Sequence, residues 1–213
     1  MIIVVAGAAG PAGQAVVRRF ADKGHTVIGV DKSGADGTLA VDLLDFDAVK
    51  QLARDIEAEH GRVDGIVHLV GGWRGSKTFA ETRLEDWDLL HDLLVRTLQH
   101  VTLAFESLLK ASERGRFAIV SAKAAERPTQ GNAAYGTAKA ASEAWTLAFA
   151  DALEGTNATA NILVVKALVN ETMRKAAPER KFPGFTDVDD LAGAIDGLWD
   201  TDANGTRLDL TRE

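Results

Sequence analysis

The sequence predicts an α/β fold in which a single parallel sheet is covered by helices on both faces. Short apolar runs rich in β-branched residues alternate along the chain with longer segments whose apolar residues recur at helical spacing. Continuous apolar runs are typical of strands buried on both faces. Right-handed crossovers between such strands lead to a doubly wound sheet of order 3-2-1-4-5-6-7 in a three-layer α/β/α architecture. The length of 213 residues suits one domain, residues 1–213.

Composition restricts the partners and the chemistry that we expect. The formal net charge of -7 argues against nucleic-acid binding, which needs a basic face. There is no cysteine to form disulfides or thiolate metal ligands, and His91 and His100 are too far apart to make a metal pair, so no metal site is expected. No apolar run reaches the ~18 residues of a membrane helix, and no basic segment precedes the first strand. We therefore expect a cytoplasmic protein that acts on a small molecule.

The first strand, residues 2–6, runs directly into a glycine-rich turn that precedes a helix over residues 14–23. Its glycines have the spacing G-x-x-G-x-x-G. Gly7 would allow the tight turn, and Gly10 would let the backbone approach a pyrophosphate. Gly13 would let the helix pack closely on the strand. In this context the motif indicates dinucleotide binding, with a plain strand–turn–helix connection as the alternative.

The residues between these glycines favour the start of a helix that binds phosphate. Pro11 suits a first helical turn because its missing N–H has no partner there. Together with Ala12 it would place free backbone N–H groups and the positive end of the helix dipole against the phosphates. The expected fold class is therefore a Rossmann-type, dinucleotide-binding sheet.

Acidic residues end the second and third predicted strands. Asp31 follows residues 26–30, where a carboxylate accepts hydrogen bonds from the adenosine ribose and repels a 2′-phosphate. This favours NADH over NADPH, although Lys32 would tolerate the phosphate and keeps NADPH open. Asp42 follows residues 38–41 and either lies near the adenine or begins the helix over residues 46–59.

The fourth strand, residues 65–70, ends in glycines. Gly71 and Gly72 would let the cofactor pass over bare backbone at the carboxyl edge of the sheet. Trp73 is either a flat wall for an aromatic substrate or an anchor for its loop. His68 lies among apolar neighbours and is better explained as a core histidine than as a catalyst.

A tyrosine and a lysine one helical turn apart are the candidate catalytic pair. After a helix over residues 84–112 and a strand over residues 116–121, residues 133–153 have helical apolar spacing. Tyr135 and Lys139 therefore lie on one face of that helix. A neighbouring cation favours the phenolate and lowers the tyrosine pKa, so Tyr135 could transfer a proton near neutral pH. The alternative is a half-buried tyrosine beside a solvated lysine.

In this order and spacing, the glycine turn, the acidic strand end, the fourth-strand glycines and Tyr-x-x-x-Lys resemble the short-chain dehydrogenase/reductase superfamily over nearly the whole chain. Two features depart from the usual pattern. Ala122 occupies the position of the family's catalytic serine, while Ser121 points to the opposite face of the strand. No asparagine occurs between Lys77 and Gly131 to serve as the family's helix asparagine.

These departures are similar to one branch, the quinonoid dihydropteridine reductases. The segments that carry this resemblance are residues 70–73, 122–125, 135–139, 171–175 and 204–210. The resemblance implies hydride transfer from a nicotinamide, with Tyr135 as proton donor. It also implies that Lys139 lowers the phenol pKa and holds the nicotinamide ribose, and that Thr172 bonds the carboxamide or the pyrophosphate. The family's usual dimer implies a homodimer formed through the helices of residues 84–112 and 133–153.

The missing serine suggests which substrate class is reduced. Losing one donor to a developing oxyanion typically lowers turnover by ~10²–10³. A quinonoid, electron-poor acceptor regains conjugation on reduction, so one acid and correct placement could suffice. We therefore expect a dihydropteridine-like substrate in contact with Trp73, Ala122 and Met173. Met173 lies in residues 171–186, which are either a mobile lid or a surface loop and also contain Arg174, Phe182 and Phe185.

Two alternative functions stay open at this point. The chain could reduce another activated quinone, imine or carbonyl. It could also be a dinucleotide-binding sensor whose active site has decayed, a reading that the lost serine favours and the intact tyrosine–lysine pair opposes.

Overall fold

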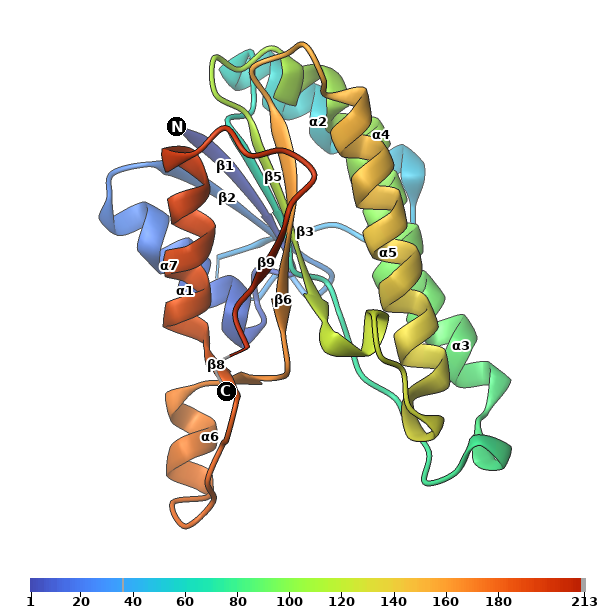
Figure 1. The fold of residues 1–213 in the computed structure, drawn as a ribbon. Coiled ribbons are helices and arrows are strands. Elements are labelled where there is room, and N and C mark those ends of the chain that lie inside the picture. The colour runs from blue at the N-terminus through green and yellow to red at the C-terminus, as the bar shows by residue number, and fades with distance from the viewer. Residues whose placement is uncertain (36, 212–213) are drawn as a thin grey trace.

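A computed structural model describes residues 1–35 and 37–211 of the chain (Figure 1). Within these residues seven parallel strands form one sheet in the order β3-β2-β1-β4-β5-β6-β9. The strands are β1 (Ile2–Ala6), β2 (Thr26–Asp31), β3 (Leu39–Ala40), β4 (Gly65–His68), β5 (Arg116–Ala122), β6 (Thr159–Val165) and β9 (Arg207–Asp209). The predicted strand order is confirmed, since β9 is the seventh strand of this sheet along the chain.

Alternating side chains on the strands build a core on each face of the sheet. Along β1, Ile3 and Val5 pack on one face, while Val4 and Ala6 pack on the other. The first face is covered by α1 (Pro11–Asp22) and α7 (Val188–Asp196), and the second by α2 (Phe46–His60), α4 (Thr97–Lys110) and α5 (Ala133–Ala152). Figure 1 shows these two helical layers on opposite sides of the sheet.

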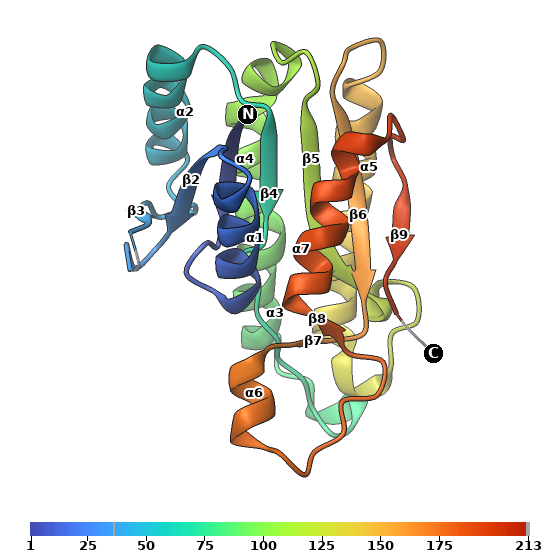
Figure 2. The same ribbon diagram turned by 90° about the vertical axis from the view of Figure 1, so that its left-hand side faces the viewer.

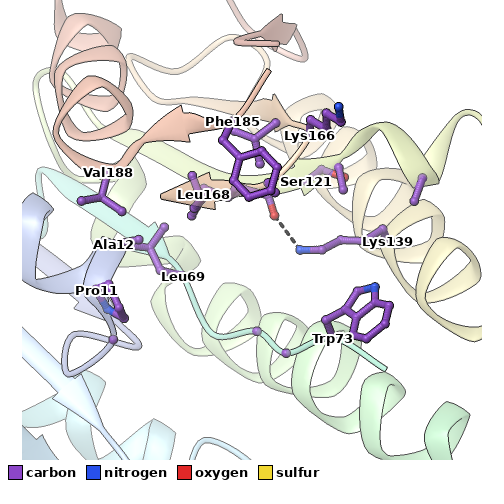
Figure 3. Close-up of a pocket in the computed structure, with 18 of the residues that line it drawn as sticks. Pro11, Ala12, Leu69, Trp73, Ser121, Lys139, Lys166, Leu168, Phe185 and Val188 are labelled. Atoms are coloured by element: carbon purple, nitrogen blue, oxygen red, sulfur yellow. Dashed lines mark hydrogen bonds between the residues drawn. The ribbon is translucent and has the colours of Figure 1, made fainter. Parts of the chain in front are cut away.

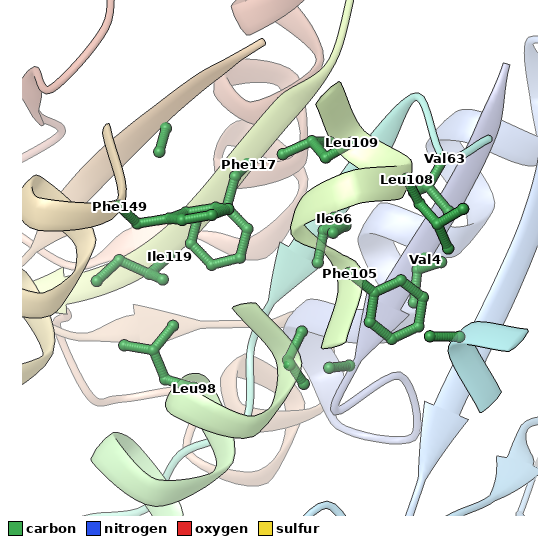
Figure 4. Close-up of a cluster of buried hydrophobic side chains, with 14 of the residues drawn as sticks. Val4, Val63, Ile66, Leu98, Phe105, Leu108, Leu109, Phe117, Ile119 and Phe149 are labelled. Atoms are coloured by element: carbon green, nitrogen blue, oxygen red, sulfur yellow. The ribbon is translucent and has the colours of Figure 1, made fainter. Parts of the chain in front are cut away.

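The larger core lies under α2, α4 and α5 and is rich in aromatic side chains (Figure 4). Phe105 and Phe117 are fully buried, and the Phe117 ring meets that of Phe149 edge-on with centroids 5.2 Å apart. Burying each such side chain contributes roughly 1.5–3 kcal/mol, so this cluster holds α4 and α5 firmly against the sheet. The start of α5 is thereby fixed relative to the strand ends.

Local sequence explains why α2 begins and ends where it does. Its apolar residues recur at helical spacing and face the core. The Asp45 carboxylate caps the helix by accepting hydrogen bonds from the backbone N–H groups of Asp47 and Ala48, at 3.0 and 3.1 Å. Gly61 ends it with φ of 74°, a left-handed conformation that glycine adopts without strain.

The prediction of one uninterrupted helix over residues 84–112 is wrong in detail. The segment comprises α3 (Leu84–His91), a π-helical turn (Asp92–Arg96) and α4. Near this turn the Leu93 carbonyl accepts a hydrogen bond from the Thr97 hydroxyl at 2.7 Å, and the Leu94 carbonyl accepts one from Ser142 of α5 at 2.8 Å. Since one of these partners comes from a different helix, apolar spacing alone could not reveal the interruption.

Most other predicted elements occur within a few residues of their expected bounds. The fourth strand is shorter than expected and ends at His68, and the helix after the glycine turn already begins at Pro11. Short 3-10 turns complete the main connections: Phe79–Glu81, Lys123–Ala125, Gln130–Asn132 and Gly197–Asp200. No helix of the described residues has the length and apolarity needed to cross a membrane.

The segment after β6 folds over the carboxyl end of the sheet (Figure 2). It contains α6 (Glu171–Ala176), and its two ends pair through β7 (Leu168–Val169) and β8 (Thr186–Asp187). The Asn170 side chain caps α6 by accepting the Met173 N–H at 2.8 Å. Phe182 packs edge-on against Phe185, with centroids 5.5 Å apart, so the predicted lid has a small aromatic cluster of its own.

Candidate active site

A cavity of about 1040 Å³ lies where the carboxyl ends of β1, β4, β5 and β6 meet the start of α5 (Figure 3). Parallel strands place their carboxyl ends at one edge of the sheet, which explains why distant segments converge there. Twelve of the predicted site residues line this cavity: Gly7, Gly10, Pro11, Ala12, Gly13, Gly71, Gly72, Trp73, Ala122, Tyr135, Lys139 and Met173.

A smaller cavity of about 270 Å³ adjoins it beyond Gly7 and Gly10, which line both. Asp31 and Asp42 line the smaller cavity. The Asp31 carboxylate accepts a hydrogen bond from the backbone N–H of Ala9 at 3.3 Å and is thereby tied to the glycine turn. The two predicted acidic positions are therefore brought together beside the turn.

Lys32, the residue that kept NADPH open in the sequence, forms an ion pair with Asp42. Its ammonium lies 2.9 Å from the Asp42 carboxylate. The hydrogen bond from Lys32 is the main reason why the pKa of Asp42 is lowered. Both side chains are substantially exposed, so the pair is weak.

The glycine turn has the geometry that a pyrophosphate requires. Gly7 has φ of 80°, and its N–H and that of Ala8 donate to the Val30 carbonyl at 2.9 and 3.2 Å. A side chain on Gly13 would put its Cβ 2.3 Å from the Gly7 carbonyl oxygen, so only glycine lets α1 approach the turn this closely. At Gly10 the nearest atom to such a Cβ is 3.4 Å away, and the backbone is open to the cavity. These residues fit a dinucleotide.

Lys139 is buried and directed at the strand rather than at the phenol. Its ammonium donates a hydrogen bond to the Val120 carbonyl at 2.7 Å (Figure 3). The same nitrogen lies 5.9 Å from the centroid of the Tyr135 ring. Burial lowers the pKa of Lys139 to about 8, although the negative charge of Glu143 opposes this effect.

The expectation that Lys139 brings the pKa of Tyr135 toward neutrality is wrong. Burial raises the pKa of Tyr135 to about 12 because removal from water disfavours the phenolate. None of the hydrogen bonds between described residues joins the lysine to the phenol oxygen. At neutral pH Tyr135 is therefore a fully protonated phenol at the cavity wall.

Ser121 lines the cavity, but its hydroxyl is committed to a hydrogen bond with Glu143. Its hydroxyl donates to the Glu143 carboxylate on α5, and Glu143 also forms an ion pair with Arg207 at 2.8 Å. Because the hydroxyl hydrogen is already used, Ser121 does not replace the donor that is missing at Ala122. Ala122 adds only a methyl group to the wall.

Two predicted side chains present apolar surface to the cavity. Trp73 is 62% exposed and lies across from Lys139 in Figure 3, so its ring is available to a flat ligand. Met173 lines the opposite, α6 side and is partly exposed. Thr172 belongs to α6 but lies outside both sets of lining residues, and its neighbour Asn170 lines the cavity instead.

His68 is buried beneath the cavity and behaves as a core residue. Its Nε2 atom lies 3.2 Å from the Thr97 hydroxyl. Burial, reinforced by the charge of Lys139, lowers the pKa of His68 to about 3, so the ring is neutral at physiological pH. A base this weak does not suit proton transfer near neutrality.

Several polar lining residues did not stand out in the sequence. They are Lys123, Arg127, Thr129, Asn132, Lys166 and Arg180. All follow β5 or β6, whose carboxyl ends form the edge of the site, and that position is the signal that could have identified them. Their spacing carries no motif, because loop conformation decides which of them face inward.

Comparison with known proteins agrees with this architecture. A family model described as short chain dehydrogenase matches residues 1–181. The NADP-dependent 3-hydroxy acid dehydrogenase YdfG of Escherichia coli is 26% identical over 168 residues, which cover 73% of this chain and 68% of that protein. A short chain dehydrogenase of Pseudocercospora fijiensis is 31% identical over 169 residues, covering 72% and 55% of the two chains.

Solved structures show the same fold at lower identity. The ligand-free aldohexose dehydrogenase of Thermoplasma acidophilum superposes with a TM-score of 0.84 at 20% identity, covering 99% of this chain and 92% of that one.

Proposed function

The chain belongs to the short-chain dehydrogenase family and is an NAD(P)-dependent oxidoreductase, and within that class we propose that it reduces a quinonoid dihydropteridine-like acceptor with NADH. The observation that carries this proposal is the composition of one cavity wall. Tyr135 and Lys139 share it with the glycine turn, next to an alanine at the position where a hydroxyl donor would be expected.

Tyr135 supplies the proton in this proposal. A bound reduced nicotinamide would supply the hydride. Tyr135 holds its proton on the phenol oxygen at neutral pH, because burial raises its pKa to about 12. It would donate this proton to the acceptor atom that becomes basic on reduction. The Lys139 ammonium, 5.9 Å from the ring centroid, would stabilise the resulting phenolate.

The methyl group of Ala122 favours an activated acceptor. A simple ketone needs two donors as its oxygen becomes negative, and losing one lowers turnover by ~10²–10³. Neither Ala122 nor the committed hydroxyl of Ser121 offers a second donor. A planar quinonoid acceptor needs less stabilisation, and the exposed Trp73 ring provides a flat surface for it.

The preference for NADH rests on Asp31 in the smaller cavity. Its carboxylate would bond the ribose hydroxyls and repel a 2′-phosphate. Lys32, which could tolerate that phosphate, is exposed and forms only a weak ion pair with Asp42. The Escherichia coli relative is NADP-dependent, so the cofactor preference is a separate part of the proposal with its own test.

A homodimer through α4 and α5 completes the proposal. Figure 1 shows these helices side by side over one face of the sheet. Leu103 on α4 is 55% exposed and Leu147 on α5 is 41% exposed, although both are large apolar side chains. A second copy of the same surface would bury them in a two-fold interface.

The deciding experiment measures NADH oxidation with quinonoid pterins, quinones and carbonyls, using the unmodified protein and Tyr135→Phe. We expect quinonoid pterins to be reduced fastest. Tyr135→Phe should bind NADH normally in calorimetry but lose at least about 100-fold in kcat, as expected for a lost general acid. Unchanged kcat would remove Tyr135 from the mechanism.

The same panel separates the alternative functions. Preferential reduction of simple quinones, imines or carbonyls would replace the pterin with that acceptor class. Binding of NADH without turnover of any compound would indicate a dinucleotide sensor.

A further inference from the structure

The wall of the large cavity is cationic, although the chain as a whole is acidic. The net charge is -7, with 31 acidic residues against 24 lysines and arginines. None of the described residues that line the cavity is an aspartate or a glutamate. Five of them are basic: Lys123, Arg127, Lys139, Lys166 and Arg180. A concave wall with a single sign of charge concentrates its field on whatever binds there.

The cofactor phosphates do not account for these cations. The start of α1, where Ala12 and Gly13 line the cavity beside the glycine turn, already suits a pyrophosphate, because the first N–H groups of a helix have no partner within it. Figure 3 shows Pro11 and Ala12, which mark that place, at one end of the cavity and Lys166 and Lys139 toward the other. Of the remaining cations, Lys123 and Arg127 follow β5, and Arg180 follows α6. All three are far from the glycine turn in the sequence.

Three of the five cations have no carboxylate partner among the described residues. Lys166 donates only to the Pro183 carbonyl, at 3.2 Å, and the Arg180 guanidinium lies 5.1 Å from the centroid of the Phe182 ring. Arg127 is exposed and takes part in none of the ion pairs that the described residues form. By contrast, Lys123 is paired with Asp209, and Lys139 is held by Val120.

We infer that the substrate carries an oxyanion, a carboxylate or a phosphate, which is bound by Arg127, Lys166 and Arg180 of the cavity wall. Arginine binds such groups through two parallel N–H bonds, and lysine binds them as a point charge. Thr129 and Asn132 line the same wall and add neutral hydrogen-bonding groups.

Through Arg180, a bound oxyanion would also affect the position of the segment between α6 and β8. Arg180 belongs to this segment and lies over Phe182, which packs against the lining residue Phe185. Binding of an anion by Arg180 would therefore hold this segment over the bound substrate. This inference rests on the proposed reductase function, because it specifies which acceptors that site takes.

The test compares two pairs of compounds that differ in one anionic group. The first pair is 1,2-naphthoquinone and 1,2-naphthoquinone-4-sulfonate, assayed by NADH oxidation. The second is 2-naphthoate and 2-naphthamide, measured by calorimetry, which needs no turnover. We expect the anionic member of each pair to bind about tenfold more tightly, and added salt to weaken only that member.

Matched variants then locate the effect. Lys166→Gln and Arg127→Gln should each raise the KM for the sulfonate about tenfold relative to the KM for the neutral quinone, as expected for one lost charge-assisted contact. The control is Lys181→Gln, which removes one charge next to Arg180 from a residue outside the cavity wall. This variant should have KM values for the sulfonate and for the neutral quinone within about twofold of those of the unmodified protein.

The outcomes keep the two proposals apart. Naphthoate that binds more tightly than naphthamide, with the difference lost in Lys166→Gln, supports the oxyanion site even if no quinone is reduced. Reduction of both quinones with equal KM, together with equal binding of the two naphthyl compounds, overturns the oxyanion site and leaves the reductase function intact. If Lys181→Gln raised the KM for the sulfonate as much as Lys166→Gln and Arg127→Gln do, the net charge of the protein rather than the cavity wall would be responsible, and the oxyanion site would be overturned.

Discussion

Tyr135 is the residue at which two opposing electrostatic effects meet. A cation close to the phenol would lower its pKa, and removal from water raises it. Removal from water is the larger effect here, because the Lys139 ammonium is drawn to the Val120 carbonyl and stays 5.9 Å from the ring centroid. In the proposed mechanism the lysine would therefore act on the phenolate after proton transfer rather than on the resting phenol.

Which of the two effects on the Tyr135 pKa is larger can be measured directly, since Tyr135 is the only tyrosine of the chain. Titration of tyrosinate absorbance in the folded protein should give a pKa near 12, against ~10 for the urea-unfolded chain. The pKa difference also sets how stability depends on pH. Between pH ~10 and about 12 the folded protein binds more protons at Tyr135 than the unfolded chain does, so the free energy of unfolding falls as pH rises through this range.

Two controls accompany the titration. Tyr135→Phe provides the absorbance blank, and circular dichroism shows whether the protein is still folded at each pH. A folded protein that titrates at or below ~10 would contradict the dominance of burial.

Asp31 belongs to the same scale, because in the proposal this single carboxylate would discriminate between NADH and NADPH. Removing it in Asp31→Ala removes the repulsion of a 2′-phosphate, so the ratio of kcat/KM for NADH to that for NADPH should fall at least about tenfold. Steady-state rates with both cofactors measure this ratio. Asp47→Ala is a suitable control, since this exposed residue lies on α2 outside both cavities. A ratio unchanged by Asp31→Ala would remove Asp31 from cofactor selection.

At the scale of elements, the site depends on how closely α1 approaches the end of β1. The backbone around Gly7 and the first turn of α1 are in direct contact at Gly13, where no side chain fits. The same close approach leaves the start of α1, at Ala12 and Gly13, at the cavity wall. In the proposed cofactor site, helix packing and phosphate binding would therefore depend on the same few backbone atoms.

Gly13→Ala should disturb both properties at once. Its Cβ would lie 2.3 Å from the Gly7 oxygen and 2.6 Å from the Ala8 Cα, so α1 must move. We expect a loss of about 1–3 kcal/mol in the free energy of unfolding and at least tenfold weaker NADH binding. Urea unfolding and calorimetry measure the two effects. Gly197→Ala is the control, because nothing lies within 4 Å of a Cβ there. Equal stability of the two variants would refute the close-packing argument.

At the scale of the whole molecule, the two faces of the sheet differ in what their helices expose. Leu103 and Leu147 leave apolar surface on the outer side of α4 and α5. Large exposed apolar side chains gathered on one face are typical of an interface between subunits. A stable dimer buries roughly 800 Å² per partner, which two adjacent long helices can supply.

The proposed dimer predicts a concentration-dependent mass in solution. Sedimentation equilibrium should give twice the chain mass for the unmodified protein. Leu103→Glu should shift it to the monomer, because a charge would be buried in the interface. Leu39→Glu alters an equally exposed leucine on β3, at the sheet edge, and should leave the dimer unchanged. A monomeric unmodified protein, or a dimeric Leu103→Glu, would rule out this interface.

Local sequence patterns determined the elements, their order and the residues that meet at the strand ends. Glycine spacing located the turn at Gly7 and Gly13, and helical spacing placed Tyr135 and Lys139 on one face, because these relations depend only on chain geometry over a few residues. The strand order followed from the same patterns together with the handedness of crossovers.

Only the tertiary structure decided the electrostatics of the site and the lining that comes from loops. The pKa of Tyr135 depends on burial by other elements, and the π-helical turn depends partly on Ser142 of a different helix. Arg127 and Lys166 line the cavity, whereas Thr172 on α6 does not, and no local period encodes which of these residues face it. Solvent exposure and through-space contacts arise only when distant segments pack together, and that is why the sequence located the candidate catalytic pair but not the charge of the cavity around it.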